Sequence, residues 1–455
     1  MPVRERTLAT LVALTFALPP PLLAAPPPAT EPVAPTPSPA QLLPQLQQAA
    51  RSSTLAWERL AYLTDRIGAR LANTPAMAKA VQWAVATLTA DGHDNVRTEP
   101  VMVPDWRRGR AGARLLAPVE REIPILALGG SVGTPGVEAP VVVVRSFAEL
   151  GPQVAGTIVE FNVPMGEGVP TIQHYGAAAA YRTGGASAAA RHGAVAVLVR
   201  SVTTRSLATL HTGLMVYADD APRIPAAAIT TEDADTLDRL ARAGVSLRLR
   251  VEMDAADHGT VESHNVLAEI RGRQRPEEIV LVGAHLDSWD VGQGVHDDGV
   301  GVVHVLETMR LIRALPVPPR RTIRAILFTC EEQGVYGGRA YAATHGGERH
   351  VAALESDLGA FRPRAWGASG SREQPGWLVD AARPLGLPVF AGGGGADIAP
   401  LAAHGVLLVG LYPDDTHYFD VHHSPADTLD KVDPQELTEG LAAFAGLAWL
   451  LANTD

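Results

Sequence analysis

The C-terminal half of the 455-residue chain alternates short apolar runs with longer runs in which apolar residues recur every three or four positions. Short apolar runs are typical of buried strands, and the longer spacing is typical of helices with one buried face. Their alternation favours a mostly parallel sheet covered by helices. The predicted strands are residues 278–284, 322–329, 351–355 and 406–412, and the predicted helices are residues 300–315 and 434–451.

An N-terminal helical region precedes this alternation. Residues 55–88 have apolar positions at helical spacing, interrupted at Gly68 and again at Asn73-Thr74-Pro75, so we expect more than one helical stretch. Residues 96–103 are then predicted to form a strand. Pro100 inside this strand favours a position at the edge of a sheet, because proline cannot donate to a ladder of hydrogen bonds.

The middle block, residues 125–257, has the pattern of a smaller α/β unit. Short β-prone runs alternate there with an Ala-rich helix and a second, shorter helix. Few of its acids are paired in metal-binding frames, which indicates an inserted, non-catalytic module. The predicted strands are residues 141–145, 156–162, 194–199, 224–229 and 245–253, and the predicted helices are residues 175–192 and 231–243.

The N-terminus has the features of an export signal. Arg4 and Arg6 precede an apolar stretch over residues 8–18, which prolines end before it is long enough to span a bilayer. We predict a signal peptide over residues 1–25 and a Pro/Ala-rich disordered linker over residues 26–45. The mature protein is then periplasmic or secreted and free of the membrane. A retained signal anchor is the alternative.

Composition narrows the class of protein further. The formal net charge of −11 argues against nucleic acid or an anionic membrane as the main partner. A short cluster of Arg107, Arg108 and Arg110 is expected on a solvated face. The single cysteine, Cys330, excludes an internal disulfide, and it ends an apolar run, so we expect it to pack as a small hydrophobe rather than act as a nucleophile.

Five residues of the C-terminal half form a candidate ligand set for two divalent metal ions. Four of them follow the carboxyl ends of predicted strands, where open α/β sheets gather ligands. Two imidazoles and three carboxylates suit two cations and leave positions for water and substrate, and one bridging hydroxide would balance the charge. The set is His285, Asp297, Glu332, Asp357 and His423, and Glu331 beside it is free to act as a base.

Some neighbours of this set could be mistaken for ligands. His296 precedes Asp297, but the set is complete without it. His422 is more consistent with a supporting role or a substrate contact than with a sixth ligand. Residues 392–395 are all glycine, yet no Lys-Ser follows them as in a phosphate-binding loop, so we expect a flexible loop bordering the pocket.

The frames around these residues resemble those of the zinc exopeptidases with co-catalytic metal sites, in the carboxypeptidase Q branch. They are G-A-H-L-D-S-W-D-V-G-Q-G, D-D-G, C-E-E-Q-G, E-S-D-L-G, G-A-D-I and H-H-S-P-A-D-T, in this order. The resemblance runs from about residue 50 to the C-terminus and includes I-P-A-A-A-I-T-T-E-D-A, similar to a protease-associated domain. It implies a mixed, mostly parallel α/β sheet flanked by helices over residues 46–124 and 258–455, with the smaller protease-associated domain inserted at residues 125–257.

The resemblance also implies a role for each site residue. Asp297 would bridge both metals, His285 and Asp357 would complete one metal, and Glu332 and His423 the other. Glu331 would be the general base. Beyond these, Asp287 would orient the His285 ring, the Asp297–Asp298 peptide would be cis, the chain could be a homodimer, and Asp397, Tyr418 and His422 are candidate substrate contacts.

The function that follows is hydrolysis of dipeptides or short peptides by a dinuclear zinc exopeptidase of carboxypeptidase or dipeptidase type. Zinc suits the mixed ligands, and cobalt or manganese would also fit. An aminopeptidase of the same family uses the same motifs and is the alternative. A glutaminyl cyclase or an inactive binding protein is disfavoured, because every ligand and the base are present.

Overall fold

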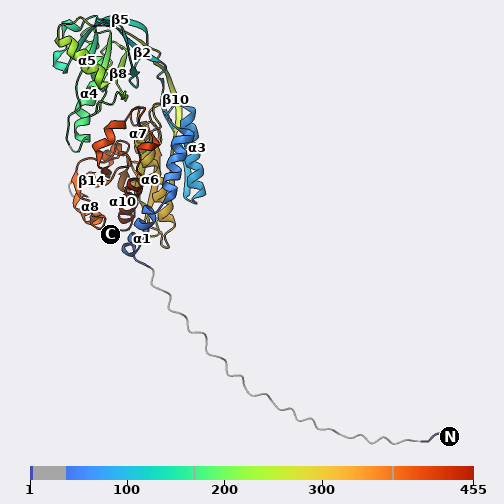
Figure 1. Cartoon of the computed structure of the whole chain (residues 1–455). Coiled ribbons are helices and arrows are strands. Elements are labelled where there is room, and N and C mark those ends of the chain that lie inside the picture. The colour runs from blue at the N-terminus through green and yellow to red at the C-terminus, as the bar shows by residue number, and fades with distance from the viewer. Residues whose placement is uncertain (4–36, 169, 371–373, 455) are drawn as a thin grey trace. The chain divides into compact units, whose positions relative to one another are not determined.

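The computed structural model describes residues 1–3, 37–168, 170–370 and 374–454. The predicted signal peptide, apart from its first three residues, and most of the predicted linker lie outside the described residues. From Pro37 onward the chain forms one compact unit that contains two sheets (Figure 1). None of the helices in the described part of the chain combines the length and apolar character needed to cross a lipid bilayer.

The first sheet has eight strands among the described residues, in the order β1-β10-β12-β11-β13-β16-β14-β15. Its four central strands, β12, β11, β13 and β16, are parallel, whereas β1, β10 and β14 join antiparallel. The predicted mixed, mostly parallel sheet is therefore confirmed, and β1 lies at its edge as Pro100 indicates. The strands are β1 Asp94–Arg107, β10 Ala256–Ile270, β11 Arg275–His285, β12 Arg321–Phe328, β13 Arg349–Glu355, β14 Pro363–Ser369, β15 Val389–Ala391 and β16 Leu407–Pro413.

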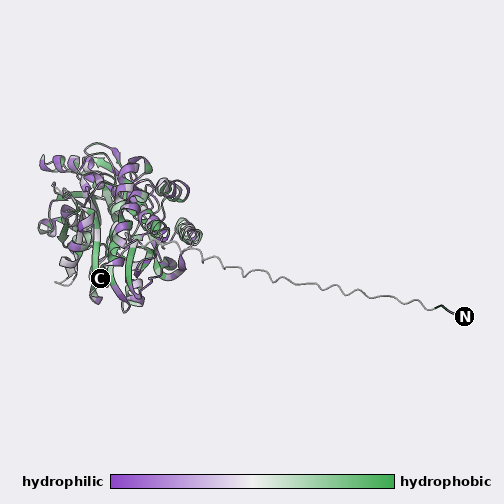
Figure 2. Ribbon diagram, turned by 90° about the horizontal axis from the view of Figure 1, so that it is seen from below, coloured by the Kyte–Doolittle hydropathy of each residue, from purple (hydrophilic) through white to green (hydrophobic). Residues whose placement is uncertain are grey.

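Helices cover both faces of this sheet. The larger apolar core lies under α6 (Val300–Arg313) and α10 (Pro434–Asn453), whose buried side chains pack against the strands. On the other face α7 (Tyr336–His345) contributes to a smaller core. Figure 2 shows strands near the centre coloured as hydrophobic and many hydrophilic residues on the outer helices. The remaining helices of this part are α2 Thr54–Ala61, α3 Pro75–Ala90, α8 Gln374–Ala382 and α9 Tyr418–Val421.

The linker expected through residue 45 ends earlier than predicted, because helix α1 (Pro39–Arg51) begins inside it. The Ser38 side chain accepts from the Gln41 N–H, and the Gln41 side chain accepts in return from the Ser38 N–H, which is a capping box. Leu42, Leu43 and Leu46 are buried in the larger core. A cap and an apolar face therefore outweigh the proline content of this segment.

The second sheet also has eight strands in the described part, ordered β3-β2-β9-β5-β6-β7-β8-β4, with α4 (Ile172–Ala190) and α5 (Thr231–Arg242) packed against it. It begins at β2, before residue 125, because β2 pairs with β9. The chain enters it after β1 and leaves it into β10. Its strands are β2 Ala111–Ala117, β3 Arg121–Ile123, β4 Ile125–Ala127, β5 Thr134–Val144, β6 Ile158–Phe161, β7 Ala196–Arg200, β8 Ala226–Ile229 and β9 Arg248–Met253.

Candidate metal centre

The five predicted ligands lie together at the carboxyl edge of the parallel strands. His285 is the last residue of β11, and Glu332 follows β12. Asp357 follows β13, and His423 follows the short helix α9 beyond β16. Asp297 lies in the turn of residues Val295–Gly299 that leads into α6, and its peptide bond to Asp298 is cis. Parallel order of the strands therefore brings residues distant in sequence to one edge of the sheet.

The five side chains form two groups that share Asp297. In the first group, His285 Nε2 is 3.0 Å from Asp297 Oδ1 and 3.3 Å from Asp357 Oδ1. In the second, His423 Nε2 is 3.1 Å from Asp297 Oδ2 and 3.0 Å from Glu332 Oε2. One oxygen of Asp297 therefore faces each imidazole, as a carboxylate that bridges two cations requires.

Both imidazoles are oriented by main-chain carbonyls. His285 Nδ1 is 3.1 Å from the Asp287 carbonyl oxygen, and His423 Nδ1 is 3.3 Å from the Thr212 carbonyl oxygen. A carbonyl can only accept, so each Nδ1 carries the proton, and in a neutral ring Nε2 then presents its lone pair to the carboxylates. Lone pairs and carboxylates facing one another need positive charge between them. The donor set therefore fits divalent cations.

Electrostatics point to the same need for positive charge. Burial opposes protonation of His285 and His423, yet neighbouring carboxylates, Asp357 for the first and Glu332 for the second, raise the pKa of both rings well above the usual range. Burial and the adjacent Asp297 raise the pKa of Glu332 to about 7. Burial, with Asp357 adding to it and His285 opposing it, also raises the pKa of Glu331.

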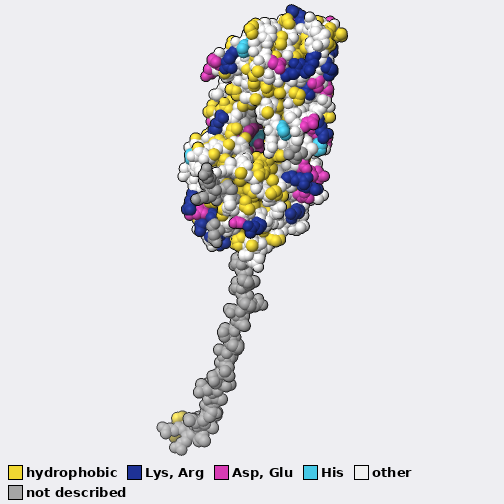
Figure 3. Space-filling model, turned by 90° about the vertical axis from the view of Figure 1, so that its left-hand side faces the viewer, with side chains coloured by type: hydrophobic (Ala, Val, Ile, Leu, Met, Phe, Trp, Pro, Cys, Tyr) yellow, Lys and Arg dark blue, Asp and Glu magenta, His cyan; other side chains and the backbone are white. Residues whose placement is uncertain are grey.

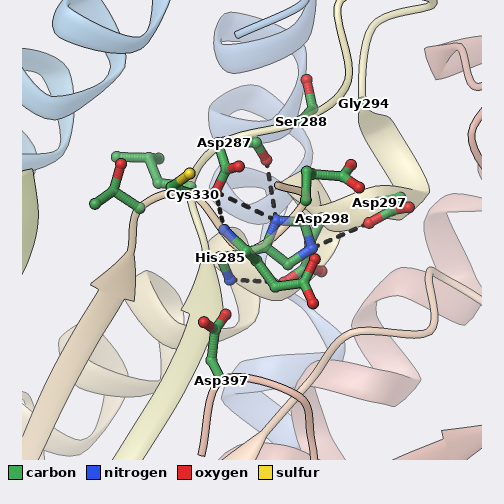
Figure 4. A network of polar contacts seen from close by, with 12 residues as sticks. His285, Asp287, Ser288, Gly294, Asp297, Asp298, Cys330 and Asp397 are labelled. Atoms are coloured by element: carbon green, nitrogen blue, oxygen red, sulfur yellow. Dashed lines mark hydrogen bonds and ion pairs between the residues drawn. The ribbon is translucent and has the colours of Figure 1, made fainter. Parts of the chain in front are cut away.

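Glu331 is placed beside the two groups by Asp287. The Glu331 N–H donates to Asp287 Oδ1 at 3.1 Å, and the buried Asp287 side chain is 3.8 Å from His285 Nδ1, beyond hydrogen-bond distance. Figure 4 shows Asp287 and Cys330 beside His285. The orientation of the His285 ring thus comes from the Asp287 backbone, and the Asp287 carboxylate holds the segment that carries Glu331.

Two neighbouring residues are close to the groups but are engaged elsewhere. Asp298 approaches His285 and Asp357, but its oxygens accept the His285 N–H at 3.1 Å and the Gly301 N–H at 2.9 Å. His296 Nδ1 accepts the Ala360 N–H, and its ring stacks on Phe361. Cys330 is buried, and burial raises the pKa of its thiol, as expected of a packing residue.

The expected substrate contacts divide into two kinds. Tyr418 and His422 line the cavity that contains Asp297 and Glu331, and His422 Nε2 is 3.5 Å from Asp297 Oδ2. His422 also stacks on His423 with ring centroids 3.6 Å apart. Asp397 instead is buried next to Ala396, which lines the cavity: Asp397 is 1% exposed, and neither of its carboxylate oxygens has a hydrogen-bond partner among the described residues (Figure 4).

The cavity over the two groups has a volume of about 340 Å³. Figure 3 shows a hollow in one face of the molecule with acidic and histidine side chains inside it. Asp357, Leu358 and Ala396 also line an adjoining cavity of about 290 Å³, bordered by Gly393, Gly394 and Gly395. Together the two cavities are large enough to hold a small molecule that lies across both.

Two buried residues that support the site from the first-sheet side were not predicted. Arg70 is fully buried and donates to the carbonyl oxygens of Leu286, Gln293 and Gly294, so it ties together the segments that carry His285 and Asp297. Asp427 accepts the N–H groups of His296 at 2.8 Å and Asp297 at 3.2 Å. The only signal for Asp427 was its place in the H-H-S-P-A-D-T frame.

Segments of the second-sheet part also contact the site, which was not expected of a non-catalytic module. Besides the Thr212 carbonyl, His211 Nδ1 is 2.7 Å from the carbonyl oxygen of His422, and Arg182 lines the cavity. Arg108, expected on a solvated face, is 7% exposed instead, because it pairs with Asp290 between Trp106 and Trp289. The sequence around these residues had not indicated any of these contacts.

Comparison with known proteins identifies what the chain is similar to. The model of peptidase family M28 matches residues 265–447. Carboxypeptidase Q of Bos taurus is 38% identical over 416 residues, which cover 89% of this chain and 87% of the bovine protein. Carboxypeptidase Q of Homo sapiens has the same identity and coverage.

Solved structures agree with these sequence relatives. The crystal structure of a peptidase M28 precursor from Shewanella amazonensis matches with a TM-score of 0.88 and 38% identity, and the match covers 91% of this chain and 97% of that one. An aminopeptidase from an Aneurinibacillus strain matches with a TM-score of 0.64 at 22% identity over 90% of this chain and 96% of that one. The second likeness extends to the fold alone.

Proposed function

Because this chain belongs to peptidase family M28, in its carboxypeptidase Q branch, and is therefore a metallo-exopeptidase, we propose that it hydrolyses dipeptides or short peptides with two zinc ions. The observation that carries the proposal is the division of Asp297 between two groups of donors. His285 and Asp357 would hold one ion with Asp297, and Glu332 and His423 the other. Zinc at these positions would acidify a water molecule and polarise the scissile carbonyl.

Glu331 is the proposed general base. It lines the cavity next to Asp297 and Asp357, and its backbone is held by Asp287. Its carboxylate takes a proton from the attacking water and passes it to the nitrogen of the leaving amine. Tyr418 and His422 face the same cavity and are proposed substrate contacts.

A short substrate is supported by the size of the cavity and by the relatives named carboxypeptidase Q. Aminopeptidase action uses the same metal chemistry and is the second candidate. The likeness to a solved aminopeptidase extends only to the fold. We further propose export from the cytoplasm, on the N-terminal sequence, and an inserted protease-associated domain, supported by the chain leaving the first sheet after β1 and returning at β10.

The test of the proposed function is hydrolysis of free dipeptides by purified protein, with and without a chelator, together with metal analysis. We expect about two zinc ions per chain and loss of cleavage on chelation. In Glu331→Gln we expect kcat to fall about 10²- to 10⁴-fold with unchanged metal content. Exposed Glu58→Gln is the matched control and should behave as wild type.

Two results would contradict the proposal in different ways. Absence of any chelator-sensitive peptide cleavage would refute the exopeptidase function. A Glu331→Gln variant that kept most of its kcat with full metal occupancy would leave the function standing and remove the base.

A further inference from the structure

A third cavity, which we call the outer cavity, lies beyond the two at the metal centre. Its volume is about 810 Å³. Phe390 is 40% exposed, and its ring meets the Tyr412 ring edge-on with centroids 4.9 Å apart. A large apolar ring left exposed in a cavity is typical of a site that an apolar ligand covers. Other apolar residues of the outer cavity are Pro170, Ile172, Ala365, Ala391 and Pro413.

The outer cavity continues the cavities at the metal centre. The adjoining cavity of about 290 Å³ shares Asp357 and Leu358 with the metal-centre cavity, and it shares Gly393 and Tyr412 with the outer cavity. Figure 3 shows hydrophobic side chains next to the hollow that contains the acidic side chains. The three cavities therefore form one groove that leads from the metal centre to β15.

Glycine keeps side chains out of the boundary between the adjoining and the outer cavity. Gly393 has a φ of +86°, and a Cβ added there would lie 2.4 Å from the Tyr412 hydroxyl oxygen. Its neighbours Gly392 and Gly394 also have positive φ, at +99° and +125°. The run of glycines thus forms a wall of the groove without filling it.

The acids along the outer part of this groove are already engaged within the protein. Glu355 accepts two main-chain N–H groups, at 2.9 and 3.4 Å. Asp415 accepts a main-chain N–H at 2.7 Å, and Asp414 pairs with Arg364 at 2.7 Å. The remaining acid that lines the adjoining or the outer cavity in the described part of the chain is the proposed zinc ligand Asp357. The groove therefore suits a neutral, apolar group better than a charged amine.

The base decides which part of a substrate enters the groove. Glu331, proposed to protonate the leaving nitrogen, lines the metal-centre cavity but not the adjoining cavity. Gly334 and Val335, which follow it in the chain, line the same cavity. The leaving amine therefore lies on the side of Glu331. The acyl part of the scissile bond extends the other way, past Asp357 toward the outer cavity.

We propose that this chain also hydrolyses N-acyl amino acids with a long apolar acyl chain, which lies in the outer cavity. The proposal rests on the proposed exopeptidase function. The water oxygen bonds to the acyl carbon, the carbon–nitrogen bond breaks, and the proton that Glu331 takes from the water passes to the nitrogen. The products are a fatty acid and a free amino acid, so the reaction needs no oxidant or reductant.

The first experiment compares acetyl-, hexanoyl- and decanoyl-leucine on the zinc-loaded wild type, with the dipeptide Ala-Leu as the test of the proposed function. Each methylene group that enters an apolar cavity should raise kcat/KM about 3-fold. We therefore expect kcat/KM for decanoyl-leucine to exceed that for acetyl-leucine by at least about 10²-fold.

Two variants test whether the chain lies in the outer cavity. Ala391→Trp fills the cavity from an exposed position, and Phe390→Asp places a charge in it. Either should lower the ratio of kcat/KM for decanoyl-leucine to that for acetyl-leucine at least about 10-fold. The control is Val379→Trp, at an exposed apolar residue of α8 that does not line the outer cavity, and it should keep the wild-type ratio. Zinc content and Tm are recorded for each variant.

A binding measurement tests the same cavity without turnover. Isothermal titration of the chelated protein with decanoate, the expected product, should show binding to wild type and to Val379→Trp. Acetate should bind neither, because it has no chain to bury. Decanoate should bind Ala391→Trp at least about 10-fold more weakly than wild type.

The outcomes separate the inference from the function beneath it. If wild type cleaves neither Ala-Leu nor any acyl-leucine, the proposed function fails. If it cleaves Ala-Leu but decanoyl-leucine no faster than acetyl-leucine, the function stands and the acyl activity is refuted. A preference for decanoyl-leucine that persists in both Ala391→Trp and Phe390→Asp would place the chain elsewhere and overturn the assignment of the outer cavity.

Discussion

The two sheets contribute to the site by different chemical means. The first sheet supplies side chains: His285, Glu332 and Asp357 stand at the ends of its parallel strands and bring their donors to one edge. The second-sheet part supplies a main-chain carbonyl at Thr212 and the guanidinium of Arg182. The side chains of the proposed metal centre thus come from the first region, whereas the second supplies a carbonyl that orients the His423 ring and a buried guanidinium at the cavity.

This difference explains why the contribution of the first region to the site could be predicted from the sequence and that of the second region could not. Ligands must be particular residue types at particular strand ends, so they leave frames such as C-E-E-Q-G. A carbonyl oxygen is present in every residue and leaves no such trace. Whether the contrast holds can be tested by disturbing each region in turn.

The largest expected effect comes from Asp297→Asn, at the point where both metal groups meet. Loss of the negative charge of the shared carboxylate should weaken the binding of both metal ions, because each of its oxygens faces a different imidazole. We expect kcat/KM to fall by at least about 10³-fold, equivalent to several kcal/mol, and zinc content to fall below two per chain. Exposed Asp430→Asn, from the loop after Asp427, is the control.

Metal analysis decides this prediction independently of activity. If Asp297→Asn kept two zinc ions and near-normal kcat/KM, the shared position would be wrong. If only one ion were lost, Asp297 would belong to a single group of ligands. The two ions would then bind more independently than the geometry of the first region indicates.

Much of the fold, and the meeting of the five candidate ligands at one edge of the sheet, could be predicted because both depend on local pattern. The strands that carry His285, Glu332 and Asp357 were predicted to within a few residues, since buried parallel strands are short apolar runs. Helix α1 was missed because prolines suggested a linker, although Ser38 and Gln41 form a capping box that the sequence does contain.

Supporting residues could not be predicted, because their partners are fixed only by the folded chain. Arg70 bonds to three carbonyls more than two hundred positions away, and nothing in its own neighbourhood indicates burial. Arg182 lies in an Ala-rich helix, where an arginine is usually solvated. Arg108 was wrongly expected on a solvated face, because the residues that bury it are likewise brought together only in the folded chain.

An intermediate effect is expected from Arg70→Met. This variant tests a residue of the first region that supports the site but lies outside the sequence frames of the candidate ligands. The variant keeps a long side chain but removes the bonds to Leu286, Gln293 and Gly294. We expect zinc affinity or activity to fall about 10- to 100-fold, as for other residues that position ligands without touching the metal. Exposed Arg66→Met, four positions earlier, should have wild-type affinity.

Competition with a chelator of known affinity measures this change. A variant that unfolded outright would be uninformative on affinity, so Tm is recorded for the zinc-loaded and chelated forms. Equal zinc affinity in a folded Arg70→Met would show that the strand ends hold the ligands without help from Arg70.

The smallest expected effect concerns Glu160 in β6, which is buried in the second sheet. Neither of its carboxylate oxygens has a hydrogen-bond partner in the part of the chain that the structure describes. Burial, together with Asp238, raises its pKa well above the ordinary value of 4.5. The folded state then holds this proton to higher pH than the unfolded chain does, so the free energy of unfolding falls as the pH rises above about 4.5.

Glu160→Gln removes this titration while keeping the shape of the side chain. We therefore expect its Tm relative to wild type to increase as the pH rises from 4.5, by about 2–4 °C for each kcal/mol of destabilisation removed. Exposed Glu122→Gln in β3 is the control. The shift should be the same with zinc and with chelator, because Glu160 lies away from the first-sheet edge. A Tm difference independent of pH would mean that Glu160 is charged in the fold, and that the second region compensates buried charge as fully as the first.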